Sequence, residues 1–131
     1  MSSFKSQRAV EYKLKRPLGE GSFSTVYKAL RRDPQFDIEQ TIALKILKSE
    51  IAVEDWKNEI AALAAVTSRH CARILGWDLI ENRPALILEW IDGITLAEWT
   101  FSSLASDQAL IDEICTQIYQ GLRDMHSKEL I

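Results

Sequence analysis

Polar and apolar residues alternate over several short stretches of the chain, with the period of two that is typical of β-strands. This alternation predicts three strands before the first helical pattern, at residues 12–15, 25–30 and 41–47. Two more strands are expected after that helical pattern, at residues 72–79 and 85–90. All five predicted strands therefore fall within the first ninety residues.

The apolar spacing changes to the helical period at residues 53–68, where a run of alanines also favours a helix. A short helix is expected at residues 96–100 and a longer amphipathic helix at residues 108–126. Five strands with one helix after the third, followed by helices only, are the order of an α+β fold. The apolar stripe of the first helix is Trp56, Ile60, Leu63 and Val66, and that of the last is Leu110, Ile111, Ile114, Ile118, Leu122 and Met125.

The remaining segments are polar. Residues 1–10 are expected to be frayed, and residues 31–40, which contain Asp33-Pro34 and scattered charges, are expected to form a surface connection. The 131 residues carry a net charge of -3, which argues against a dedicated nucleic-acid binder, and a membrane span or secretory signal is not expected. Cys71 and Cys115 form no CxxC pair, so a reducing, cytoplasmic location is the simpler interpretation.

The strongest chemical signal is a glycine-rich turn between two predicted strands, LGEGSFSTVYKA at residues 18–29. Glycines allow backbone N–H groups to approach phosphate oxygens without obstruction by a Cβ atom. A dinucleotide-binding motif is excluded because a strand follows the glycines, and a P-loop is excluded because Gly-Lys-Ser/Thr is missing. A plain hairpin turn remains the alternative for this segment taken alone.

Two charged residues stand in apolar patterns. Lys45 shares one face of its strand with Ala43 and Leu47, and the simple alternative is a lysine on a solvated sheet face. Glu59 falls in the apolar stripe of the first helix, where a carboxylate is costly unless it is paired; the alternative is a side chain that reaches water at the edge of the stripe. A Lys45–Glu59 ion pair would explain both charges and would point the ammonium group at a phosphate.

These three elements, in this order, resemble the N-terminal lobe of the eukaryotic-type protein kinases. The resemblance continues through LILEWIDG at residues 86–93, which is similar to the fifth strand and hinge, and through residues 117–127, which are similar to the helix before the catalytic loop. It implies a flexible N-terminus at residues 1–10 and an N-lobe at residues 11–91 with a five-stranded antiparallel sheet and helix C. Residues 92–131 would then be the hinge and the helices D and E of an incomplete C-lobe.

The resemblance also implies a nucleotide site for ATP. Lys45 would contact the α- and β-phosphates and Glu59 would orient it, the two being the catalytic pair of this lobe. Leu88 would be the gatekeeper, and the backbone of Glu89 and Ile91 would hydrogen-bond the adenine edge. The cofactor-binding residues implied are Leu18, Gly19, Glu20, Gly21, Ser22, Phe23, Ser24, Val26, Ala43, Lys45, Leu88, Glu89 and Ile91, and no metal ligand is expected.

The sequence departs from the kinase pattern in several places. Ser24 replaces the usual third glycine, Trp90 replaces a more usual Tyr or Phe in the hinge, and Lys45 and Glu59 are only fourteen residues apart. The kinase motifs H-R-D-x-x-x-x-N, D-F-G and A-P-E are missing. Arg123-Asp124 is not the first of these motifs, because it lies inside the helical pattern. We expect the chain to hold ATP, with Mg-ATP used by a complete parent, and not to transfer phosphate by itself.

Three function classes are compatible with these features. The first is the ATP-binding part of a Ser/Thr-type protein kinase, and the second is a natural half-kinase or pseudokinase that acts as a binding or regulatory module. The third is a small-molecule kinase with a similar lobe, against which the close match of the glycine-rich segment argues. For the partners, we expect self-association or docking through residues 108–131, whose apolar stripe would be exposed, and neither nucleic acid nor membrane.

Overall fold

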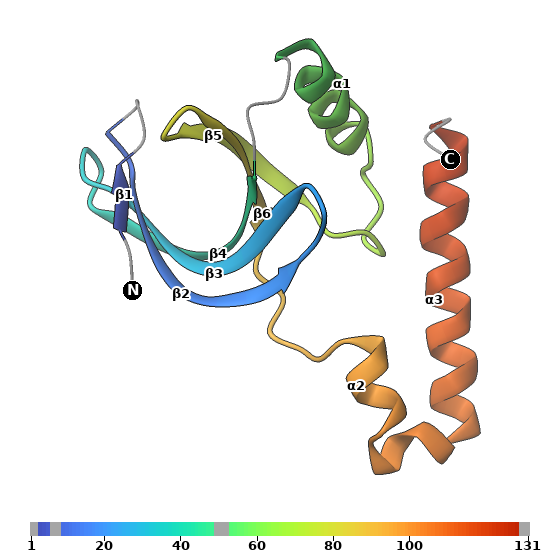
Figure 1. Ribbon diagram of the computed structural model, residues 1–131. Helices are drawn as coiled ribbons and strands as arrows, with labels where there is room; N and C mark the ends of the chain where they lie inside the picture. Colours follow the sequence, from blue (N-terminus) through green and yellow to red (C-terminus); the bar gives the residue numbers. More distant parts are fainter. Residues whose placement is uncertain (1–2, 6–8, 49–52, 129–131) are drawn as a thin grey trace. The chain divides into compact units, whose positions relative to one another are not determined.

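A computed structural model describes residues 3–5, 9–48 and 53–128. Its largest element is an antiparallel six-stranded sheet with the strand order β1-β2-β3-β4-β6-β5. Figure 1 shows that this sheet is strongly curved, with β2, β3 and β4 bending together so that one face of the sheet is concave. The strands are β1 Ser3–Lys5, β2 Glu11–Glu20, β3 Ser24–Asp33, β4 Ile38–Leu47, β5 Ile74–Ile80 and β6 Arg83–Glu89.

The five predicted strands are confirmed, but the sheet is larger than the pattern indicated. Ser3–Lys5, within the segment expected to be frayed, pairs with the start of β2, with Phe4 opposite Tyr12. The predicted surface connection at residues 31–40 is wrong at both ends, because Arg31 pairs with Gln40 and the hairpin closes at residues 34–37. Charged side chains are compatible with a strand when they project from a solvated face of the sheet, and the alternation rule missed this.

Four helical segments complete the described chain, and they are α1 Val53–Ala64, α2 Leu96–Thr100, the 3-10 helix η1 Ser103–Ser106 and α3 Gln108–Ser127. The N-terminal ends of α2 and α3 are capped by Thr95 and Asp107, whose side chains accept hydrogen bonds from backbone N–H groups.

Helix α1 ends four residues before its predicted end. Ser68 accepts the N–H of His70 through its hydroxyl and that of Cys71 through its carbonyl, and this local turn competes with the helix.

The chain divides into two compact units. The first comprises the described residues of Met1–Ala64 and Arg73–Trp90, and the second those of Ala65–Ala72 and Ile91–Ile131. Residues 65–72 therefore group with the second unit, although they lie inside the range 11–91 expected for the lobe. None of the described helices combines the length and the apolar character that crossing a bilayer requires.

The two faces of the sheet have different neighbours. Ile42, Leu44 and Ile46 of β4 point into the main apolar core inside the curve, together with residues of β2, β3, β5 and β6. The opposite face is contacted by α1, whose buried Trp56 packs edge-on against Trp77 of β5 with ring centroids 4.9 Å apart. This second face carries the residues with candidate chemistry.

Candidate nucleotide-binding site

Strand register collects the candidate residues on the face opposite the main core. Residues directly opposite each other in antiparallel strands point to the same side of the sheet. One cross-strand row is Gly19, Val26, Lys45 and Leu86, and the neighbouring row is Arg16, Lys28, Ala43 and Leu88. Residues expected to surround a nucleotide thus come from four strands and share one face.

The glycine-rich turn is tied to the end of β4. The Gly21 N–H donates to the Ser24 carbonyl at 2.8 Å, and the Lys48 N–H donates to the Phe23 carbonyl at 2.8 Å. The Lys48 ammonium also lies 2.6 Å from a carboxylate oxygen of Glu20, and this hydrogen bond, reinforced by the charge, holds the pKa of Glu20 below its ordinary value. Sequence reasoning missed Lys48, because no local pattern relates it to a turn more than twenty residues away.

The two glycines of this turn are not required by the fold. No glycine in the described ranges has a positive φ angle, so Gly19 and Gly21 adopt backbone conformations open to other residues. A Cβ atom on Gly19 would meet nothing within 4 Å, and one on Gly21 would come no closer than 3.8 Å to the Ser24 carbonyl oxygen. The bare backbone of the turn borders open space, which is the arrangement that a phosphate cradle needs. With Phe23 exposed at the tip, the segment fits the cofactor that the sequence implies.

The structure pairs Lys45 of β4 with Glu59 of α1, with Nζ and Oε1 3.5 Å apart. The fourteen-residue spacing is therefore long enough for the two side chains to meet. The Glu59 side chain is 43% exposed and not enclosed by apolar residues, so the expectation of a costly buried carboxylate is wrong. An ion pair this exposed contributes at most about 1 kcal/mol to stability.

The end of β6 provides part of the expected hinge. The Glu89 N–H donates to the Arg73 carbonyl at 2.9 Å, and its carboxylate accepts the Arg73 N–H at 2.8 Å. The backbone N–H of Glu89 is therefore engaged by Arg73. Ile91 belongs to the second unit and is 60% exposed, whereas the other candidate residues lie in the first unit.

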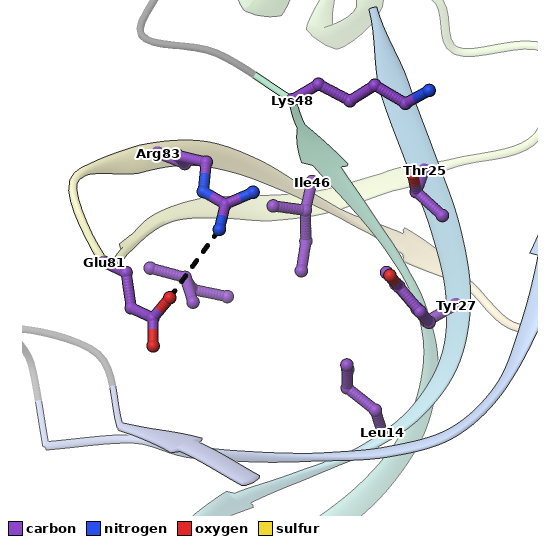
Figure 2. Close-up of a pocket in the computed structure, with 8 residues that line it drawn as sticks. Leu14, Thr25, Tyr27, Ile46, Lys48, Glu81 and Arg83 are labelled. Carbon is purple, nitrogen blue, oxygen red and sulfur yellow. Dashed lines mark ion pairs between the residues drawn. The ribbon is translucent and has the colours of Figure 1, made fainter. Parts of the chain in front are cut away.

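A small hollow of about 90 Å³ lies inside the curve of the sheet, on the face opposite the candidate nucleotide site (Figure 2). Its lining includes Leu14, Tyr27 and Ile46, which belong to or pack on the main core. Arg83 and Glu81 form an ion pair of 3.7 Å at its wall. Because strand alternation turns these core residues away from Val26 and Lys45, this hollow is separate from the candidate nucleotide site.

Comparison with known proteins shows the family of this chain. The protein kinase domain family model matches residues 12–131, and the chain belongs to this family. The chain is 33% identical over 116 residues to a G-type lectin S-receptor-like serine/threonine-protein kinase of Arabidopsis thaliana, covering 83% of this chain and 13% of that protein. It is 26% identical over 130 residues to the serine/threonine-protein kinase PknB of Lactococcus lactis, covering 94% of this chain and 20% of that protein. Mouse Aurora kinase C is 29% identical over 126 residues, covering 92% of this chain and 44% of that protein.

The chain thus spans between 13% and 44% of the length of these three relatives. The match begins at Tyr12, close to the start of β2, and includes the glycine-rich turn, Lys45 and Glu59. The expected membership in the protein kinase family and the α+β lobe with its antiparallel sheet are confirmed.

Proposed function

We propose that the first unit binds ATP as the nucleotide-binding lobe of a Ser/Thr-type protein kinase. The observation that carries this proposal is the shared face on which a bare glycine-rich turn lies in register with Lys45, while Glu59 orients that lysine. A planar apolar group is accommodated by Val26, Ala43 and Leu88 on the same face. The serine/threonine class follows the names of the relatives.

The groups that would hold the phosphates follow from the hydrogen bonds of the turn. Since the Gly21 N–H is used by the Ser24 carbonyl, the N–H groups of Ser22 and Phe23 are the candidates at the tip. Lys45 would supply a positive charge to the α- and β-phosphates. Magnesium, when it is bound with the nucleotide, would neutralise phosphate charge, and these residues offer no kinase motif for it.

Phosphate transfer is not proposed for these residues alone. The 131-residue sequence holds no H-R-D-x-x-x-x-N and no D-F-G, so it lacks the base and the metal ligands that the family uses. The alternative is a binding or regulatory module, and the exposed Ile118 and Leu122 on α3 favour it because an apolar surface of this kind commonly meets a partner.

A cytoplasmic location is part of the proposal, supported by the use of ATP and by the free thiols of Cys71 and Cys115.

Thermal unfolding with increasing ATP, with and without magnesium, tests nucleotide binding. The melting temperature of the wild type should rise with ATP concentration, because a ligand that binds only the folded state stabilises it by mass action. Lys45→Met should lose most of this shift. Lys13→Met is the matched control, since it removes an exposed lysine elsewhere on the same sheet and should respond to ATP like the wild type.

The outcomes separate the proposed function from its alternative. No ATP-dependent shift in the wild type would contradict nucleotide binding. An equal shift in the wild type and in Lys45→Met would contradict the assigned role of Lys45. Transfer of the γ-phosphate to a generic protein substrate by the 131-residue polypeptide would contradict the expected inactivity.

A further inference from the structure

Three side chains outside the expected nucleotide contacts converge on the same face of the sheet. The Lys28 ammonium lies 4.7 Å from the ring centroid of Trp90, and the Arg16 guanidinium carbon lies 5.8 Å from it. Both distances are within the range in which a cation is attracted to the face of an aromatic ring. Trp90 is the last residue of the first unit, one position beyond the end of β6.

The register explains how strands that are not neighbours meet here. Arg16 of β2 is opposite Lys28 of β3, which is opposite Ala43 of β4, which is opposite Leu88 of β6. Trp90 follows Leu88 by two positions. The small side chain of Ala43 leaves room above β4, so that Lys28 and the indole can approach each other across that strand.

An irregularity in β2 contributes to this arrangement. The register between β2 and β3 shifts between Leu14 and Arg16, and the pair that follows the shift is Arg16 opposite Lys28. Bulges of this kind redirect side chains. Two like charges placed directly opposite each other are unfavourable in a sheet, and the electron-rich ring face of Trp90 offsets that cost by attracting both.

We propose that Arg16, Lys28 and Trp90 form a cation–aromatic clamp that fixes the β2–β3 hairpin to the end of β6. The two segments that the clamp joins are the two walls of the proposed adenine site, with Gly19 and Val26 on the hairpin and Leu88 and Glu89 on β6. Arg16, Lys28 and Trp90 are positioning residues, which act on nucleotide affinity through the walls that they hold. This inference rests on the proposed ATP-binding function for its effect on affinity, but the clamp itself is a property of the sheet.

Nuclear magnetic resonance tests the geometry of the clamp. A methylene group held over an indole face is shifted upfield by the ring current, so the Lys28 Hε protons should be upfield of those of the other lysines in the wild type. Trp90→Leu should remove this shift and Trp90→Phe should keep part of it. Lys28 Hε resonances at ordinary positions in the wild type would overturn the clamp.

Isothermal titration calorimetry tests the consequence of the clamp. Lys28→Met keeps the length of the side chain and removes its charge, and should raise the Kd for ATP by a factor of about two to five, the effect expected of an exposed cation–aromatic pair. Lys28→Arg should restore the wild-type Kd, and Lys13→Met should leave it unchanged. An ATP affinity of Lys28→Met equal to that of the wild type would overturn the positioning role.

Failure of the proposed function has a separate signature. If the wild type binds no ATP, the nucleotide-binding proposal is contradicted and the clamp is judged by hydrogen exchange. The amides of residues 25–29 should then exchange faster in Lys28→Met than in the wild type or Lys28→Arg, because the hairpin opens more readily when it is held less firmly. Unchanged exchange would overturn the clamp.

Discussion

Tyr12 places a polar group inside the apolar core of the sheet. Its hydroxyl donates to Asp78 Oδ2 at 2.7 Å, and the other carboxylate oxygen of Asp78 accepts the Leu79 N–H at 2.8 Å. Both side chains are almost completely enclosed, with Tyr12 at 0% and Asp78 at 3% exposure. Burial, followed by the hydrogen bond to the Asp78 carboxylate, raises the pKa of the Tyr12 hydroxyl far above its ordinary value.

Tyr12→Phe should destabilise the protein by about 1–3 kcal/mol, because it leaves a buried carboxylate without its hydroxyl partner. Urea unfolding measures this loss. Tyr119→Phe is the matched control, since Tyr119 is 65% exposed on α3 and its hydroxyl should contribute little. Equal effects of the two substitutions would show that the Tyr12–Asp78 hydrogen bond does not stabilise the fold.

The same hydroxyl predicts an alkaline limit to stability. In the unfolded chain Tyr12 should ionise near its ordinary pKa of about 10, whereas in the folded chain it stays protonated at that pH. Its contribution is therefore fully present below about pH 10 and is lost as the pH rises above that value. Unfolding free energies at pH 9 and pH 11 should differ less in Tyr12→Phe than in the wild type.

At the scale of elements, α3 depends on a close contact within the second unit. Gly121 is its buried residue, and a Cβ atom placed there would lie 3.3 Å from the His70 carbonyl oxygen and 3.6 Å from the Cys71 sulfur. The Cys71 thiol also approaches the Gly121 carbonyl at 3.7 Å. The absence of a side chain at this position allows residues 65–72 to pack directly against the helix.

Gly121→Val should therefore destabilise the second unit by about 1–3 kcal/mol, since the new side chain has to displace backbone atoms of His70. Denaturation followed by the helical circular dichroism signal measures this change. Gln120→Val controls for the low helix propensity of valine at an exposed neighbouring position. A loss no greater than that of the control would mean that the segment at residues 65–72 moves aside without cost.

At the scale of the whole molecule, α3 presents apolar side chains to solvent. Ile118 is 47% exposed and Leu122 is 44% exposed, while four other members of the predicted stripe, Leu110, Ile111, Ile114 and Met125, are partly buried. Apolar residues one helical turn apart that stay exposed favour association. We expect a second copy of the chain to cover this face when the 131-residue polypeptide is concentrated.

Size-exclusion chromatography with light scattering should show a mass that rises above 14.9 kDa with concentration. Ile118→Glu and Leu122→Glu should return the mass to that of a monomer, because a charge on this face opposes its burial. Gln120→Glu adds the same charge to a polar neighbouring position and should leave the association unchanged. A constant monomer mass in the wild type would contradict the expected self-association.

Much of the fold was accessible from local patterns. The strand period placed Lys45 and Ala43 on one face of β4, and the helical period located α1 and α3, because alternation and helical spacing are consequences of backbone geometry. The short strand β1 and the ends of β3 and β4 were not predicted. Their pairing is decided by the neighbouring strand, which supplies hydrogen bonds that polar residues accept as readily as apolar ones.

The candidate site shows the same division. The glycine-rich turn, Lys45 and Glu59 were identified from the order of their motifs, and all of them lie within the residues that the family model matches. The helical stripe predicts that Glu59 is buried among apolar residues, and this is wrong because the exposure of a helix face depends on what covers it. Lys48, which holds Glu20 and the turn, had no signal in the sequence.

The sequence by itself determined the family, the succession of strands and helices, and the residue types able to meet a nucleotide, since these depend on local spacing and on motif order. The tertiary structure decided which distant residues touch. It alone placed Lys48 beside Glu20, Tyr12 beside Asp78, and Arg16 and Lys28 over Trp90. These contacts follow from strand register and sheet curvature, which arise from packing of the whole sheet and leave no periodic trace along the chain.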